Sequence, residues 1–140
     1  MGFLKGSGAD VKKNYKMGKQ LGAGNFAVVK IAEKTSANKS ADIPQTVAVK
    51  IIDKSKVEEM TDITREIEIM QSMDHPNVIK LFEIYDEPKK MNLIMELVTG
   101  GELFDRIVAK GSYTEKDAAD VIVTLCGALA YLHGKQIVHR

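Results

Sequence analysis

Residues 21–29 are Leu21-Gly22-Ala23-Gly24-Asn25-Phe26-Ala27-Val28-Val29, a turn with two glycines that runs into β-branched residues. Glycine adds no side chain, so such a turn can lay its backbone N–H groups over phosphate oxygens. The partly alternating residues 15–21 and the β-branched residues 28–34 predict a strand on each side of the turn. The pattern therefore predicts a hairpin with both glycines at its tip. An ordinary hairpin with two turn glycines remains the alternative.

Two other glycine motifs do not fit this chain. A dinucleotide-binding fingerprint needs glycines that open a helix and an acidic residue about 20 positions further on. Asp42 has that spacing, but it lies in a polar loop, and strand-forming residues follow Ala27. The Walker phosphate loop also fails, because Gly134-Lys135 is followed by Gln136 and not by Ser or Thr.

A lysine interrupts the next apolar run, Val47-Ala48-Val49-Lys50-Ile51-Ile52, which predicts a strand buried on both faces. Burying this lysine is costly unless its ammonium meets an anion. Residues 60–73 change to a helical period, with Glu66 near the edge of the apolar face. A buried lysine held by that glutamate could direct a fixed ammonium at the oxygens of a nucleoside triphosphate. The alternative is that Glu66 only pairs with neighbours such as Arg65 on a solvated face.

The remaining pattern predicts an α+β fold with its strands first. Residues 78–85 and 91–97 predict two more strands, and residues 102–110 and 114–136 predict two helices. Gly111 should end the first of these helices, and Thr114 with Asp117 resembles a capping box at the start of the second. Strands and helices do not alternate as in a doubly wound sheet. Residues 1–13 are aperiodic and predict a flexible leader.

Composition excludes several classes of protein. The 20 basic and 19 acidic residues give a net charge of +1, which offers no electrostatic reason to expect nucleic acid or a membrane as a partner. The 44% hydrophobic content is that of a globular chain. The single cysteine, Cys126, indicates a reducing compartment, and we expect a cytoplasmic location. No side-chain cluster predicts a metal site.

Taken together, the motifs resemble a eukaryotic-type protein kinase from Tyr15 onward. The resemblance rests on the order and approximate spacing of residues 21–29, Val47–Lys50, Arg65–Ile67, His75-Pro76-Asn77 and His139-Arg140. Residues 95–104 also resemble the hinge and following helix of the calcium/calmodulin-dependent group of Ser/Thr kinases. The resemblance implies a kinase-like N-lobe, with five antiparallel strands and one helix, over residues 14–98. Residues 99–140 would then begin an incomplete C-lobe with two helices.

The resemblance also implies a role for each site residue, with ATP and Mg²⁺ as cofactors. Lys50 would contact the α- and β-phosphates and be held by Glu66. Gly22 and Gly24 would cover the triphosphate, with Phe26 at the tip of the turn, and Leu21, Val29 and Ala48 would form an apolar ceiling over adenine. Met95 would line the rear of the pocket. Glu96 and Val98 would offer backbone groups to the edge of adenine, and Glu102 would contact the ribose.

The sequence departs from the kinase pattern in two ways. Ala27 stands where the motif has its third glycine, which adds a methyl group and stiffens the loop. The sequence also ends at Arg140, before the catalytic aspartate and the magnesium-binding motif of the family. We therefore expect the ATP-binding part of a Ser/Thr protein kinase that is inactive alone, with calmodulin acting only through regions outside it. The alternative is a non-catalytic module that works by nucleotide binding or protein docking.

Overall fold

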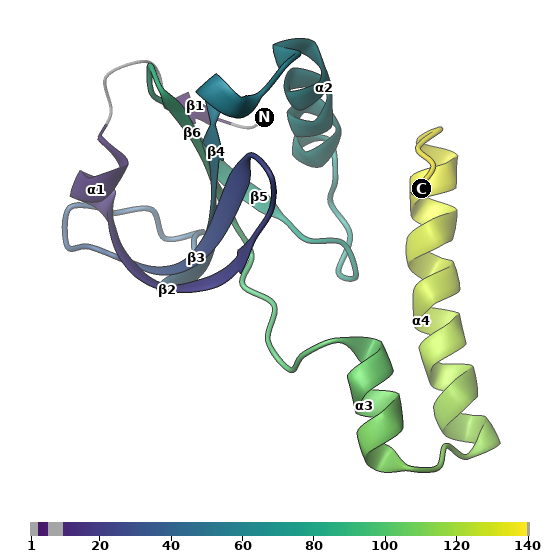
Figure 1. Cartoon of the computed structure of the whole chain (residues 1–140). Helices are drawn as coiled ribbons and strands as arrows, with labels where there is room; N and C mark the ends of the chain where they lie inside the picture. The colour runs from purple at the N-terminus through teal and green to yellow at the C-terminus, as the bar shows by residue number, and fades with distance from the viewer. Residues whose placement is uncertain (1–2, 6–9, 140) are drawn as a thin grey trace. The chain divides into compact units, whose positions relative to one another are not determined.

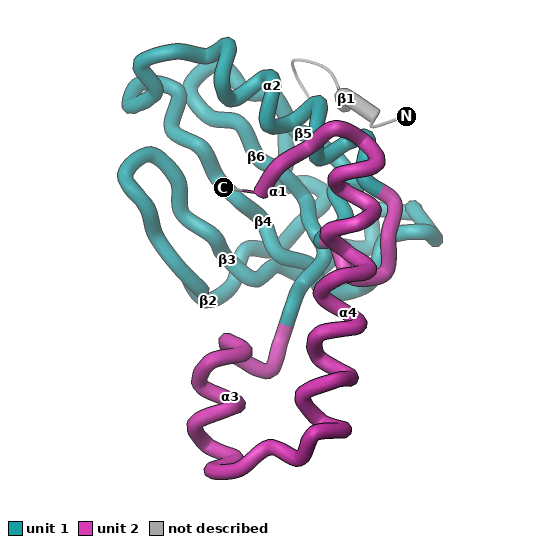
Figure 2. The backbone as a smooth tube through the Cα atoms, turned by 90° about the vertical axis from the view of Figure 1, so that its right-hand side faces the viewer, with its two compact units in different colours: residues 1–73, 79–98 teal, residues 74–78, 99–140 magenta. Residues whose placement is uncertain are grey.

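The computed structural model describes the backbone of residues 3–5 and 10–139 and the side chains of residues 10–139. The chain divides into two units, which Figure 2 shows in different colours. The first unit comprises residues 1–73 and 79–98, and the second comprises residues 74–78 and 99–140.

A six-stranded sheet forms the frame of the first unit (Figure 1). Its strands are β1 (Phe3–Lys5), β2 (Tyr15–Ala23), β3 (Ala27–Lys34), β4 (Thr46–Asp53), β5 (Leu81–Asp86) and β6 (Lys90–Met95). They stand in the order β1-β5-β6-β4-β3-β2, and all pairs are antiparallel except β1 with β5. The predicted α+β fold and its five antiparallel strands are confirmed, and β1 adds a sixth, parallel strand.

Strand β4 lies inside the sheet, between β3 and β6, and this explains its apolar sequence. Successive side chains of a strand point to opposite faces. Val47 and Val49 are fully buried in one apolar cluster, whereas Ile52 is buried in the cluster on the other face. Strand β4 therefore contributes side chains to the apolar clusters on both faces of the sheet, as its nearly unbroken hydrophobic sequence predicts.

Helix α2 (Met60–Gln71) covers one face of the sheet. Ile63 and Ile67, one turn apart, are both buried and pack with Ile52 of β4. The helix was predicted to reach residue 73, but it ends at Gln71, where the Ser72 N–H donates to the carbonyl oxygens of Glu68 and Ile69. A short 3₁₀ helix, η1 (Lys54–Lys56), precedes it.

The opposite face of the sheet has a polar group at the centre of its core. The rings of Tyr15 and Tyr85 meet edge to face with centroids 6.0 Å apart. Both hydroxyls donate to Glu83 Oε2, at 2.7 Å from Tyr15 and 3.1 Å from Tyr85. Burial, reinforced by the hydrogen bond to Glu83, raises the pKa of Tyr15 well above its ordinary value.

Residues 1–2 and 6–9 of the predicted leader, residues 1–13, lie outside the described residues, and its described part contains two short elements. Phe3–Lys5 forms β1, and Val11–Asn14 forms the one-turn helix α1. The Asp10 carboxylate caps α1 by accepting from the Lys12 N–H at 2.9 Å, and Val11 is buried against the core of this face. The periodicity argument missed α1 because one turn with a single buried valine is too short to show a period.

The second unit is helical, with α3 (Leu103–Lys110) and α4 (Glu115–Gly134). Gly111 ends α3 at φ 75°, a backbone conformation that favours glycine. At the start of α4, the Asp117 N–H donates to Thr114 Oγ1 at 3.1 Å, and the Thr114 N–H donates to Asp117 Oδ2 at 3.2 Å. Both predicted helix boundaries are therefore confirmed. No helix among the described residues is long and apolar enough to cross a membrane.

Polar and ring contacts join residues 74–78 to α4 within the second unit. The Asp74 N–H donates to the hydroxyl of Tyr131 at 2.7 Å. The His75 ring lies against the Tyr131 ring with centroids 5.0 Å apart. These contacts explain why a segment between α2 and β5 groups with the helices and not with the sheet.

Candidate functional site

Lys50 lies in the middle of β4, in a row that crosses four strands. Gly22 of β2 pairs with Val29 of β3, Val29 with Lys50, and Lys50 with Leu93 of β6. Residues paired across neighbouring strands present their side chains on the same face. The row therefore places a glycine of the hairpin, an apolar side chain and a cation side by side on the face that α2 covers.

Glu66 of α2 meets Lys50 on this face. The distance from Lys50 Nζ to Glu66 Oε1 is 3.4 Å. The pair is less buried than the sequence predicts, because 23% of the lysine side chain and 51% of the glutamate side chain remain exposed. The lysine lies at the open edge of the core, where its ammonium escapes the cost of full burial.

The geometry of this pair matters more than its contribution to stability. Ion pairs this exposed contribute about 0–1 kcal/mol, since water screens the attraction and two long side chains lose freedom. The glutamate does, however, restrict where the ammonium can point. A positive charge held on an accessible sheet face beside a glycine turn is suited to an anionic ligand.

Three apolar site residues share the face of Lys50. Val29 is its direct cross-strand partner, and Ala48 lies two positions before it on β4. Ala48 in turn pairs with Met95 at the end of β6. Leu21 lies at a register shift in β2, between Gln20 and Gly22, and is 50% exposed. The structure thus brings Val29, Ala48 and Met95 together beside Lys50 and leaves Leu21 at the open rim.

A backbone hydrogen bond closes the glycine turn, and Gly22 beside it faces open space. The Gly24 N–H donates to the carbonyl oxygen of Ala27 at 2.8 Å, which closes the hairpin. A Cβ added at Gly22 would meet no atom within 4 Å, so this position faces open space. The turn therefore has room on its surface for a ligand to approach the backbone.

Phe26 and Ala27 anchor the hairpin to the core. Both are partly buried and pack against the apolar cluster that includes Ile52. The Phe26 carbonyl oxygen also accepts from the Asp53 N–H at 2.8 Å. The methyl group that replaces the third glycine of the motif therefore packs into the α2 face instead of crowding the turn.

Residues 96–98 leave the sheet after β6 and offer backbone groups. The Glu96 N–H donates to the Lys80 carbonyl oxygen at 2.8 Å, and the Glu96 side chain accepts from the Lys80 N–H at 3.2 Å. Val98 is 63% exposed and forms no backbone hydrogen bond with another described residue. Of the groups assigned to adenine, the Glu96 amide is therefore already used, whereas the Val98 backbone is available.

Glu102 belongs to the second unit, where it is the N-cap residue of α3. Its side chain forms no capping hydrogen bond and is exposed. Its ribose contact stays a prediction. Arg140, in the last kinase-like motif, lies outside the described residues.

Sequence reasoning missed one member of this site, Leu93. It is buried, pairs directly with Lys50 and packs in the cluster with Ile63 and Ile67 of α2. The alternation of Met91, Leu93 and Met95 was the available signal, because it places all three on one face of β6. Nothing in the sequence says that this face is the one shared with Lys50, since that depends on cross-strand register.

The described residues do not fit a metal ion. They contain no group of three or more His, Cys, Asp or Glu side chains that could hold one.

Known proteins resemble this chain over nearly all of its length. The protein kinase domain family matches residues 15–140. Myosin light chain kinase A of Dictyostelium discoideum is 44% identical over 133 residues, which cover 94% of this chain and 43% of that protein. Calcium/calmodulin-dependent protein kinase type 1 of Macrobrachium nipponense is 44% identical over 131 residues, covering 93% of this chain and 36% of the relative. Human serine/threonine-protein kinase DCLK3 is 44% identical over 133 residues, which cover 94% of this chain and 20% of that protein.

The chain therefore spans less than half the length of each of these relatives. All three are kinases by name, one of them a serine/threonine-protein kinase and one a calcium/calmodulin-dependent protein kinase, so the resemblance drawn from the motifs is confirmed. On the family match and on these relatives, this chain belongs to the protein kinase family.

Proposed function

We propose that this chain forms the ATP-binding part of a Ser/Thr protein kinase. One observation carries the proposal: the Lys50 ammonium lies 3.4 Å from Glu66 and in the same cross-strand row as Gly22 of the hairpin. In this proposal Lys50 contacts the α- and β-phosphates, and Glu66 orients it. The backbone of Gly22 and Gly24 covers the triphosphate, with Phe26 supporting the turn.

The apolar residues beside Lys50 supply the contact with adenine. Leu21, Val29 and Ala48 pack over the base, and Met95 lines the rear of the pocket. The Glu96 carbonyl and the Val98 backbone hydrogen-bond to the edge of the base. In this assignment Glu102 of the second unit contacts the ribose. A mainly apolar surface with a few directed polar groups suits a nucleotide site.

The complete kinase would transfer the ATP γ-phosphate to a protein hydroxyl. That reaction depends on positioning and on neutralising charge, with magnesium, an aspartate that accepts the hydroxyl proton, and a magnesium-binding motif. In the family these groups follow the position of Arg140. We therefore propose that residues 14–98 act as the N-lobe, that residues 99–140 begin the C-lobe, and that the 140-residue chain alone binds ATP without appreciable transfer.

Calorimetric titration of the 140-residue chain with ATP tests the nucleotide site. Lys50→Met should weaken binding at least about tenfold, because it removes a charge-assisted contact worth about 1.5–3 kcal/mol. Lys39→Met, at an exposed lysine of the 35–45 loop, is the matched control and should bind as the parent does. Equal affinity for Lys50→Met and the parent would remove the assignment of Lys50 and with it the proposed site.

A second candidate function is a non-catalytic module that docks onto another protein. The apolar side chains of α3 and α4 support it, since Phe104 is 71% exposed and Val123 is 70% exposed. Size-exclusion chromatography, together with binding of an apolar dye, distinguishes the docking module from the ATP-binding part. A sharply monomeric chain that binds no dye argues against the docking module, whereas dye binding that another protein suppresses supports it.

A further inference from the structure

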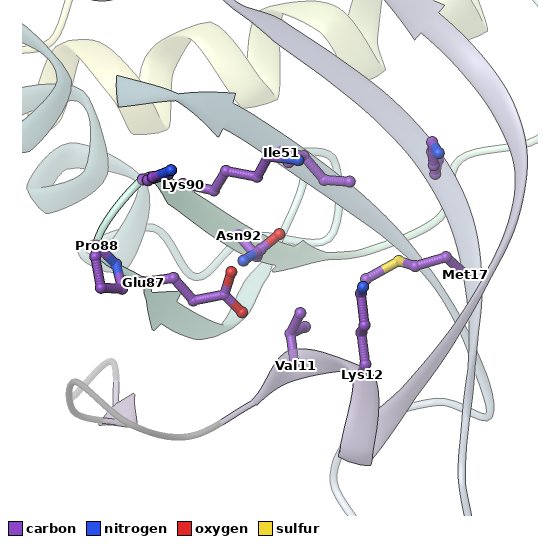
Figure 3. Close-up of a pocket in the computed structure, with 10 residues that line it drawn as sticks. Val11, Lys12, Met17, Ile51, Glu87, Pro88, Lys90 and Asn92 are labelled. Carbon is purple, nitrogen blue, oxygen red and sulfur yellow. The ribbon is translucent and has the colours of Figure 1, made fainter. Parts of the chain in front are cut away.

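A cavity lies on the sheet face opposite α2, entirely within the first unit (Figure 3). Its volume is about 670 Å³, within the range of small-molecule sites. Lys30 of β3 opens onto this cavity, whereas its chain neighbour Val29 shares the face of Lys50. The cavity is therefore separated from the proposed ATP site by the sheet itself.

The cavity wall is strongly basic. Four lysines line it, Lys12, Lys30, Lys89 and Lys90, against a single carboxylate from Glu87. Within the part of the chain that the structure describes, none of these four ammonium groups forms an ion pair. Cations gathered around a concave surface raise the local concentration of anions.

Asn92 adds a buried donor to this wall. The residue is only 2% exposed, and its Nδ2 atom has no hydrogen-bond partner among the described residues. Figure 3 shows its side chain projecting from β6 into the space that Glu87 and Val11 flank. Buried polar groups are normally paired, so an N–H₂ without a described partner in a residue of the cavity wall is a donor that a ligand acceptor would satisfy.

The rest of the wall is apolar. Val11, Met17, Ile51 and Pro88 complete the lining. Val11 is buried, and Met17 and Ile51 pack against the core beneath it. A fully polar anion would leave this surface without a partner, whereas a ligand with an apolar body would cover it.

We propose that this cavity binds a small amphiphilic anion, an apolar chain or ring that ends in a carboxylate or a phosphate. The anionic oxygens accept from the Asn92 amide and the lysine ammonium groups, and the apolar body covers Met17 and Ile51. All the polar groups of the wall except the Glu87 carboxylate can donate, which excludes a cationic ligand and favours an oxygen anion.

The test is an NMR titration of the ¹⁵N-labelled 140-residue chain, read at the Asn92 side-chain amide. The probes are decanoate and decyl phosphate below their micelle concentrations, with decanol as the uncharged control. We expect saturable shifts of the Asn92 amide with at least one anion and none with decanol. Whichever anion binds more tightly identifies the headgroup. ATP should not displace it, because the nucleotide site lies on the other face.

Two lysine variants make the test specific. Lys30→Gln removes the charge but keeps a polar side chain, and should weaken anion binding about tenfold through loss of one charge-assisted contact. Lys19→Gln, an exposed lysine of β2 outside the cavity, should bind as the parent does. Asn92→Leu, followed through the backbone amide of Leu93, should also weaken binding and leave the melting temperature equal or higher.

Four results would overturn the proposal. They are equal binding of decanol and the anions, no effect of Lys30→Gln, shifts confined to the exposed helices of the second unit, and an Asn92 amide already protected from exchange without ligand. The last would mean that the amide has an internal partner.

Discussion

The two units of this chain contain similar apolar sequence but use it differently. In the first unit the sheet has an apolar cluster on each face, and Val47, Val49 and Ile94 are fully buried. In the second unit neither α3 nor α4 has a buried residue. A sheet covered on both faces completes its own core, whereas two helices leave their apolar stripes without a partner.

In the second unit, polar contacts connect α3 and α4 in place of apolar burial. Lys110 of α3 donates to Asp117 of α4 at 2.7 Å, next to the capping box of Thr114 and Asp117. The Lys110 ammonium also lies 4.7 Å from the centroid of the Tyr113 ring. Directional surface contacts therefore define the α3–α4 connection, and apolar burial defines the first unit. The following predictions test that difference.

Truncating a core residue should give the largest effect. Ile94→Ala removes a fully buried side chain of β6 and should lower the free energy of unfolding by about 2–5 kcal/mol. Leu125→Ala, at a half-exposed position of α4, should change it by less than about 0.5 kcal/mol. Urea unfolding with amide exchange resolved by residue measures both. Similar losses for the two variants would show that the second unit also depends on apolar burial.

The buried tyrosine pair should give the next largest effect. Tyr15→Phe deletes a buried hydroxyl that donates to Glu83, and should destabilise the chain by about 1–3 kcal/mol near neutral pH. The control is Tyr113→Phe in the second unit, whose hydroxyl has no hydrogen-bond partner among the described residues and whose loss should leave stability unchanged.

The same tyrosine makes a pH prediction. The fold raises the pKa of Tyr15 above its ordinary value of 10.0, so the unfolded chain loses this proton first as pH rises. The stabilisation is complete below about pH 10 and is lost above it. Above about pH 10 the urea midpoint of the parent should fall more steeply with pH than that of Tyr15→Phe. Parallel profiles for the two proteins would contradict the assignment.

The sequence predicts the helices and strands of this fold better than it predicts which of their residues lie side by side. The two-glycine turn, the apolar run around Lys50 and the helical period of residues 60–73 each depend on local spacing, and each element forms close to its predicted bounds. The capping box at Thr114 is also local. What the sequence could not supply was cross-strand register, which places Leu93 beside Lys50.

Features built from distant segments were not predictable. The basic cavity combines residues of α1, four strands and the turn before β6, and none of its lining residues belongs to a kinase-like motif of the sequence. The parallel pairing of β1 with β5 is likewise set by tertiary contact. The half-exposure of Glu66 was missed because a periodic pattern gives the face of a helix but not how far the sheet covers it.

The helix cap of the second unit should give a smaller effect. Thr114→Ala removes the acceptor for the Asp117 N–H and should cost about 1 kcal/mol of local stability at the start of α4. Thr114→Ser keeps the hydroxyl and is the matched control. Amide exchange over residues 115–119 measures the change. Protection unaffected by Thr114→Ala would mean that the cap does not hold this terminus.

The smallest effect should come from acid titration of the same terminus. The hydrogen bond from Lys110, together with those from Thr114, lowers the pKa of Asp117 below its ordinary value of 3.8. The contribution of the carboxylate is therefore complete above about pH 3.8 and is lost as pH falls through the lower, folded pKa. NMR titration of the Asp117 carboxyl in Lys110→Gln should show its pKa rising toward the ordinary value, and Lys116→Gln should leave it unchanged. Added salt should produce part of the same rise in the parent, because water and ions reach this exposed pair. The buried hydrogen bond from Tyr15 to Glu83 should not respond to salt, and an equal response of both would remove the distinction between a unit defined by surface contacts and one defined by burial.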